Sequence, residues 1–377
     1  MEESEMRVLF LGSSLFVGLA AQVGMTLLGL VVIASFSPAT AAGQPVEASY
    51  LKASNTQADD RFGSAVAMWG DTVVVGAPGE DGSDDSAPLS GAAYVYVRDG
   101  SGSWSQQAYL KADSLDDRDE FGYSVGVAGS WIIAGAPFED GSATGVGGGD
   151  DNSTESAGAV YVFEDSGGGN WAQTEYLKAS NSGVNNRFGT AAAIAGTTIV
   201  VAAPDEGSAA TGVNGDPGLG SAISSGAAYV FEHAEPDGWG QTAYIKAFNT
   251  GTQDRFGRSV SASDNLIVIG AHQEGSGSGG RPSDNSRQDA GAAYVYRREL
   301  DGTWSFDAYH KALRPGTGDV FGHGVAVAGE VIVVAALEED SAATAIDGDQ
   351  SDNSADGAGA VFAFRGVPWF FSDRFAQ

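Results

Sequence analysis

The stretch DRFGSAVAMWGDTVVVGAPGEDG, residues 60–82, joins a Phe-Gly pair to a Gly-Ala-Pro triplet through two short apolar runs. The runs cover residues 62–69 and 72–78, and the Gly70-Asp71 pair between them is typical of a β-hairpin turn. The second run is rich in valine and apolar on both faces, so it is expected to be a strand covered by neighbouring sheets. The stretch therefore predicts a tight antiparallel hairpin that ends in an acidic, glycine-rich loop.

The same pattern recurs five times along the chain. Its Phe-Gly pairs are spaced by 59, 67, 68 and 65 residues and begin at Phe62, Phe121, Phe188, Phe256 and Phe321. Two further strand-like runs follow the first hairpin, at residues 91–97 and 104–112, and their counterparts follow the later ones. A period of this length is typical of a β-propeller. We therefore expect an all-β propeller of five four-stranded antiparallel blades, with repeats near 59–112, 118–179, 185–247, 253–312 and 318–364.

One copy of the outer strand is displaced to the front of the chain. The segment ASYLKAS around Tyr50 matches the fourth run of the other repeats, and it precedes the first Phe-Gly pair. We expect this N-terminal strand to complete the fifth blade and close the ring, because closure removes exposed sheet edges. The alternative is that the chain is a fragment of a six- or seven-bladed ring, in which Trp369 marks a further outer strand.

The first 42 residues are expected to target the chain for export. No charged residue stands between Arg7 and Glu47, and most of this interval is strongly apolar. Ala39 and Ala41 flank Thr40 as small residues do at a signal-peptidase site, which predicts cleavage near Ala41. Because the apolar stretch is also long enough to span a bilayer, a retained membrane anchor is the alternative. We expect residues 43–377 to form a single propeller domain, secreted or at the cell surface.

The charge balance limits the partners of this chain. It has 49 acidic residues against 19 Lys and Arg, a formal net charge of −30, and no cysteine. Such a charge repels phosphate backbones and anionic lipid headgroups. We therefore expect no nucleic-acid partner, and membrane contact only through an uncleaved N-terminal segment. The fold cannot depend on disulfides.

The recurring pattern resembles the FG-GAP repeats of the N-terminal β-propeller of integrin α subunits. The resemblance is strongest at Phe62 and Phe121 with their Gly-Ala-Pro triplets at 76–78 and 135–137, and it covers residues 50–364. It implies an extracellular, non-catalytic propeller that binds other proteins or matrix. The calcium loop that this family often places between the first two strands does not carry over, because that connection is too short here to surround an ion.

The expected function is recognition or adhesion rather than catalysis. In a four-stranded meander, the second-to-third and fourth-to-first connections share one face, and all the long acidic loops fall among them. Loops on a rigid scaffold are the usual place for binding. We therefore expect an extracellular protein, glycan or matrix partner on that face. A secreted enzyme on a propeller fold and an architectural protein of the cell envelope are the alternatives.

The acidic loops also contain candidate metal and modification sites. Asp347, Asp349 and Asp352 supply closely spaced hard oxygens, so they are the candidate ligands for Ca²⁺, the one cofactor that the sequence suggests. The alternative is that these acids only keep the surface solvated. Asn152 begins an Asn-Ser-Thr sequon and is a glycosylation acceptor if the host glycosylates exported proteins.

Two further patterns suggest chemistry. Gly-Tyr-Ser-Val-Gly around Ser124 matches the elbow of serine hydrolases, but it falls on a first strand without a strand-to-helix turn, so Ser124 is not expected to be a nucleophile. His272 and His323 belong to neighbouring blades, so we consider them as a metal-binding pair. The default expectation is a structural role for each.

Overall fold

The computed structural model describes residues 49–82, 87–149, 151–277 and 284–365. The chain divides into two units, 1–48 and 49–377, and the described residues all belong to the second. The predictions for the targeting segment, for Ala41 and for Trp369 lie outside the described residues. The described part of the chain contains no helix with the length and apolar character needed to cross a membrane.

Nineteen strands form five antiparallel sheets in the described residues. The first sheet contains β1 (Ala65–Trp69), β2 (Thr72–Ala77), β3 (Ala92–Arg98) and β4 (Trp104–Leu110). The second contains β5 (Ser124–Ala128), β6 (Trp131–Ala136), β7 (Ala159–Asp165) and β8 (Trp171–Leu177). The third contains β9 (Ala191–Ala195), β10 (Thr198–Ala203), β11 (Ala227–Ala234) and β12 (Gly238–Ile245). The fourth contains β13 (Phe256–Ala262), β14 (Leu266–Ala271), β15 (Ala292–Arg298) and β16 (Trp304–His310), and the fifth contains β17 (Phe321–Ala328), β18 (Val331–Ala336) and β19 (Ala360–Arg365).

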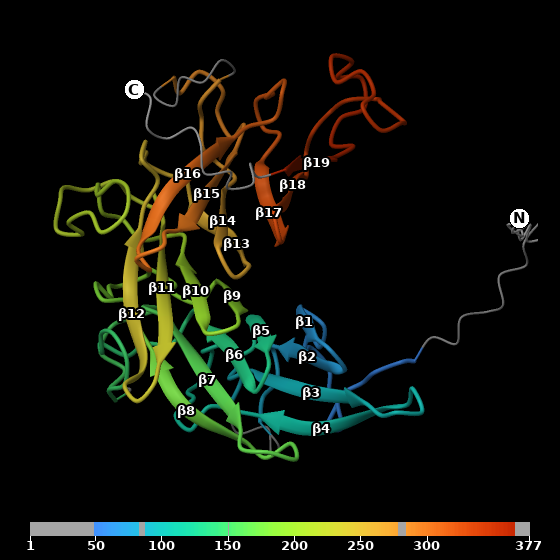
Figure 1. Cartoon of the computed structure of the whole chain (residues 1–377), viewed down its shortest axis with the longest axis vertical. Coiled ribbons are helices and arrows are strands. Elements are labelled where there is room, and N and C mark those ends of the chain that lie inside the picture. The colour runs from blue at the N-terminus through green and yellow to red at the C-terminus, as the bar shows by residue number, and fades with distance from the viewer. Residues whose placement is uncertain (1–48, 83–86, 150, 278–283, 366–377) are drawn as a thin grey trace, which may run out of the picture. The chain divides into compact units, whose positions relative to one another are not determined.

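Each sheet is a meander in chain order, and the sheets follow one another around a common axis (Figure 1). The first strand of each sheet lies innermost, where β1, β5, β9, β13 and β17 contact their neighbours in sequence. The second strands β10 and β14 are buried at every position, which is the reason for their apolar sequence on both faces. The unit is a five-bladed β-propeller, and the predicted fold class is confirmed.

The Phe-Gly and Gly-Ala pairs meet at the boundary between successive blades. A Cβ atom on Gly76 would lie 1.9 Å from the carbonyl oxygen of Gly122 in the next blade, so no side chain fits there. The Phe121 N–H donates a hydrogen bond of 2.9 Å to the Ser90 carbonyl across the same boundary. The Phe121 ring packs edge-on against Tyr161 of its own blade. The repeated sequence pattern therefore reflects one inter-blade contact that recurs around the propeller.

The fifth blade differs from the sequence expectation. Its sheet has three strands in the described residues, and residues 49–53 belong to no strand. Ala53 is buried against the first blade, and the Tyr96 hydroxyl donates a hydrogen bond of 2.7 Å to the Lys52 carbonyl. These contacts hold the segment to the first blade. The described residues therefore do not show the N-terminal strand that was expected to complete the fifth blade, and β19 has no outer neighbour among them.

Candidate functional site

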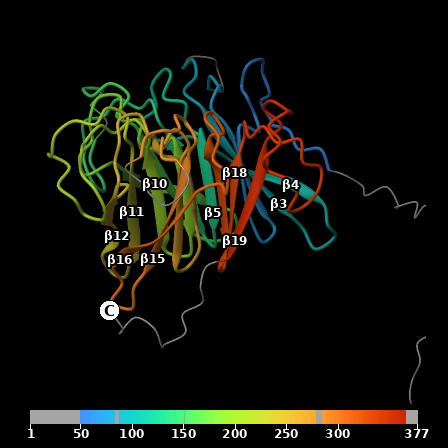
Figure 2. The same ribbon diagram turned by 90° about the horizontal axis from the view of Figure 1, so that it is seen from above.

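The long connections gather on one face of the propeller, which we call the loop face (Figure 2). The second-to-third connections begin and end at 78–91, 137–158, 204–226, 272–291 and 337–359. The first four are each hydrogen-bonded to the fourth-to-first connection that enters the next blade, as when the Arg118 N–H donates to the Pro88 carbonyl at 2.8 Å. The prediction that both sets of connections share one face is confirmed by these bonds.

A buried glutamate stands at the start of each second-to-third connection. These five glutamates are at most 5% exposed, and each follows the end of a second strand by three residues: Glu80, Glu139, Glu206, Glu274 and Glu339. In the first four blades the glutamate forms an ion pair with the lysine just after the fourth strand: Lys111, Lys178, Lys246 and Lys311. A carboxylate is stable inside a protein only when it is paired and hydrogen-bonded, so these lysines fix the glutamates in place.

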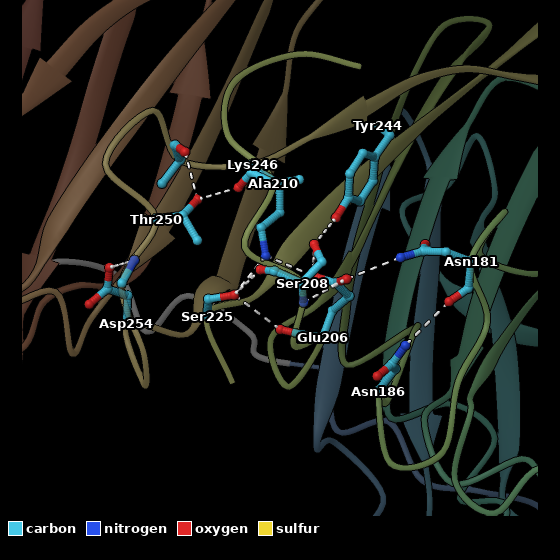
Figure 3. A network of polar contacts seen from close by, with 12 residues as sticks. Asn181, Asn186, Glu206, Ser208, Ala210, Ser225, Tyr244, Lys246, Thr250 and Asp254 are labelled. Atoms are coloured by element: carbon cyan, nitrogen blue, oxygen red, sulfur yellow. Dashed lines mark hydrogen bonds and ion pairs between the residues drawn. The ribbon is translucent and has the colours of Figure 1, made fainter. Parts of the chain in front are cut away.

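Figure 3 shows this network in the third blade. The Lys246 Nζ lies 2.6 Å from the Glu206 Oε2, and the Asn181 Nδ2 donates to the Glu206 Oε1 at 3.0 Å. The hydroxyls of Ser208 and Tyr244 are hydrogen-bonded at 2.7 Å. Burial lowers the pKa of Lys246, and Glu206 opposes that shift. The network ties the base of the loop to the outer strand and to the entering connection.

These glutamates are not distinguished from the solvated loop acids by composition alone. The signal that separates them is position, since each stands at the same place in its repeat, and a Tyr-x-Lys triplet ends four of the fourth strands. The fifth such triplet contains Lys52, whose Nζ lies 5.9 Å from the centre of the Phe62 ring. Glu339 forms no ion pair with a lysine within the described residues.

A cavity of about 490 Å³ opens between the innermost strands, and we call it the central cavity. Every blade contributes to its lining the residue that follows the Phe-Gly pair, namely Ser64, Tyr123, Thr190, Arg258 and His323. A side cavity of about 180 Å³ shares Tyr123, Thr190 and Arg258 with it. Because these residues are some 65 positions apart in the sequence, only the propeller brings them together.

Arginines dominate the charge of the side cavity. Arg187, Arg255 and Arg258 line it, together with the single carboxylate of Asp205. The Arg187 Nη1 lies 3.3 Å and the Arg255 Nε lies 3.9 Å from Asp205 oxygens. The Arg187 guanidinium also lies over the Phe138 ring, 5.2 Å from its centre. The sequence analysis did not identify this cluster, because nothing in the repeats marks these arginines as neighbours.

Two of the residues that the sequence singled out reach the central cavity. Ser124 is buried, and its hydroxyl donates to the Gly189 carbonyl of the next blade at 2.8 Å, a structural bond. The rings of His272 and His323 lie 6.0 Å apart, centre to centre, so the prediction that they approach one another is confirmed. The Arg258 Nη2 lies 3.4 Å from the His323 Nε2, and this positive charge opposes a metal cation between the rings.

The three candidate calcium ligands lie in the connection after β18. Asp349 accepts hydrogen bonds of 2.8 and 2.6 Å from the N–H and hydroxyl of Ser351, which lower the pKa of Asp349. Within the described residues, no three His, Cys, Asp or Glu side chains are grouped so that they could hold a metal ion. The structure therefore does not bring Asp347, Asp349 and Asp352 together, and calcium binding stays a prediction.

The sequon residue Asn152 is exposed, and its Nδ2 donates to the Asp116 carboxylate at 2.6 Å. Its position on a surface connection is the one that the sequence predicted. Glycosylation at this residue stays a prediction.

The repeat pattern matches a family model described as FG-GAP repeat, over residues 46–96, 104–163, 171–231 and 239–296. These segments cover more than half of the chain. The chain belongs to the FG-GAP repeat family. The later matches begin at or beside the fourth strands β4, β8 and β12 and run through the next three strands, so one FG-GAP unit spans two blades. The first match begins at residue 46, in the segment that resembles a fourth strand.

A comparison with curated proteins finds no match. One similar solved structure is the periplasmic gluconolactonase PpgL of Pseudomonas aeruginosa, with 14% sequence identity and a TM-score of 0.41. The alignment covers 72% of this chain and 64% of that protein, so the FG-GAP chain spans somewhat less than two thirds of its length. At this TM-score the likeness carries no argument about function.

Proposed function

We propose that this FG-GAP protein is a non-catalytic recognition or adhesion module, secreted or held at the cell surface, that binds an extracellular protein or glycan through its loop face. The observation that supports this most is the presence of exposed apolar side chains on the second-to-third connections. Ile346 is 95% exposed, Ile223 is 67% exposed and Leu219 is 54% exposed, all on second-to-third connections. Exposed apolar groups on a fixed scaffold are typical of sites that bind another macromolecule.

The lining of the cavities gives further support for a binding role. Asp205 is the only carboxylate that lines either of the two described cavities, and the Ser124 hydroxyl is bonded to the backbone. A general acid and base pair needs two titratable groups with opposed protonation states at the reacting atoms. Asp205 is instead paired with two arginines, and His323, which lines the central cavity, lies 3.4 Å from the Arg258 guanidinium.

The test is capture of the labelled protein on an array of extracellular glycans and matrix proteins. A variant with Ile346→Asp and Leu219→Asp is expected to lose binding by about tenfold or more, because charges would replace apolar contacts at the interface. The matched control is Leu300→Asp, since Leu300 is 89% exposed in the third-to-fourth turn, away from the loop face. Equal loss in both variants, or no capture of the unaltered protein, would contradict the proposal. Repeating the assay with a chelator tests the calcium prediction.

A further inference from the structure

The side cavity concentrates positive charge in a chain whose formal net charge is −30. Arg187 and Arg255 share one carboxylate, that of Asp205, at 3.3 and 3.9 Å. Arg258 lines the same cavity, and it forms no ion pair with an acid within the described residues. Three permanent cations therefore face one anion, and the local charge has the opposite sign to that of the molecule.

Arg258 is the least compensated of the three. Arg258 is partly buried, and its guanidinium contacts the His323 Nε2 at 3.4 Å. Burial, together with Arg258, lowers the pKa of His323, so the imidazole is neutral at pH 7 and does not add a competing positive charge. A guanidinium in this position has N–H donors free to form charge-assisted hydrogen bonds with an anion from solution.

His272 is a second imidazole that lies near the positive charge of these arginines. It is 9% exposed, and its Nδ1 has no hydrogen-bond partner in the described structure. Burial, with the nearby charges of Arg258, His323 and Arg255, lowers the pKa of His272 to about 4. Burial opposes a proton on this imidazole, and the nearby cations add to that effect. The ring retains an unused buried polar atom next to His323.

We propose that Arg187, Arg255 and Arg258, which we call the arginine cluster, bind a small oxyanion: the carboxylate or phosphate group of a solute. The planar guanidinium matches both groups with paired N–H donors. Pro137, Phe138 and Pro204 line the same side cavity and offer apolar contact to the uncharged part of a ligand. The adjoining central cavity of about 490 Å³ is in the range that small-molecule sites occupy.

The acidic loops favour a small anion over a polyanion. Acids such as Asp140 and Glu155 lie on the second-to-third connections of the same face. Their repulsion grows with the number of charges that approach, so a nucleic acid or an acidic polysaccharide is opposed. A single oxyanion inside the side cavity meets the arginines at short range, where screening is weak. This inference does not depend on the partner proposed for the loop face.

The test is calorimetric titration of the full chain at low ionic strength with inorganic phosphate and, separately, with glucuronate as the carboxylate probe. Arg258→Gln is expected to weaken binding at least tenfold, because it removes the uncompensated charge and keeps a polar side chain. The matched control is Arg98→Gln. Arg98 pairs with Asp71 at 2.6 Å in the first blade, away from both cavities, so this variant should bind as the unaltered chain does.

The outcomes separate cleanly. Binding of phosphate alone or of glucuronate alone supports the proposal and identifies the oxyanion. No binding of either probe, or equal affinity in Arg258→Gln and the unaltered chain, overturns it. As a second readout, the imidazole NMR signals of His272 and His323 should titrate at higher pH when the anion is bound, because it offsets the arginines. An unchanged titration also overturns the proposal, whereas loss of loop-face capture leaves it untouched.

Discussion

At the scale of single residues, the buried Glu-Lys pairs are the most consequential contacts in the structure. The side chains of Glu206 and Lys246 are 3% and 0% exposed, so each charge depends on the other for compensation. Replacing a buried pair with apolar groups often costs little, but removing one partner leaves an isolated charge in a medium of low dielectric constant. We therefore expect the pair to specify one loop conformation more than it adds net stability.

The first residue-scale prediction concerns this pair. Lys246→Met should lower the free energy of unfolding by about 3–5 kcal/mol, because Glu206 is left buried without a cation. The double variant Glu206→Gln/Lys246→Met should lose less than the single variant, since no buried charge remains. Urea unfolding at pH 7 measures both. A double variant less stable than Lys246→Met would show that the pair does not act through charge compensation.

The second residue-scale prediction concerns pH. Burial, together with the charge of Glu274, raises the pKa of Asp254 to about 7. As the pH rises, the carboxyl is therefore deprotonated in the unfolded chain before it is deprotonated in the folded protein. The free energy of unfolding falls for this reason between about pH 4 and 7, and it stays lower above pH 7. Asp254→Asn should remove that loss and stabilise the fold at pH 8 by up to about 4 kcal/mol. The equivalent residue of the third blade is already an asparagine, Asn186.

Thermal unfolding at pH 4 and pH 8 checks this pH prediction. The gain from Asp254→Asn should be small at pH 4, where the carboxyl is protonated in the folded state and about half protonated in the unfolded chain, and full at pH 8. Asp349→Asn is the control, because hydrogen bonds from Ser351 lower the pKa of Asp349, and its replacement should give no stabilisation at pH 8. A gain of equal size at both pH values would mean that the effect is not one of protonation.

At the scale of elements, the sequence specifies the hairpins much better than it specifies the cavities. The β1–β2 hairpin is local: its turn residues, its alternation and its valines all lie within residues 62–78, so a short window contains the whole signal. No short stretch of sequence contains the signal for the arginine cluster. Arg187 lies in the connection that precedes β9, and Arg258 lies on β13 of the next blade, so only the stacking of whole sheets brings them to one cavity. The glutamates that fix the loops lie between these cases, since their signal is visible only when the repeats are aligned.

At the scale of the whole propeller unit, the first and last blades expose apolar side chains at positions whose equivalents in the second blade are buried. Val66 is 69% exposed and Met68 is 60% exposed on β1, and Val361 is 68% exposed on β19. The corresponding strand β5 is buried at every position. Apolar strand faces and unpaired edges of this kind favour association with another strand. The fourth strand of the fifth blade therefore remains the structural prediction to test.

A pair of introduced cysteines tests it in a chain that has none of its own. Val95 pairs with Ala108 in the first blade, and the repeat places Ala363 and Ser49 at the equivalent positions. If the N-terminal segment completes the fifth blade, Ser49→Cys/Ala363→Cys should form an intramolecular disulfide under mild oxidation. Non-reducing electrophoresis and mass spectrometry detect it. A disulfide-linked dimer would instead show strand exchange between copies, and no crosslink would contradict the closure prediction.

The contacts of residues 52–55 have a practical consequence for anyone who shortens this chain. Asn55 accepts a hydrogen bond of 2.7 Å from the Tyr94 hydroxyl, and Tyr96 bonds to the Lys52 carbonyl. The repeat pattern in the sequence starts at the first Phe-Gly pair, but an expression boundary placed there would remove both hydrogen-bond acceptors. The buried Tyr94 phenol would then have to find water or remain unsatisfied, and Tyr96 would keep only its longer bond of 3.4 Å to the Gln106 Oε1. Recombinant versions should start well upstream of Lys52.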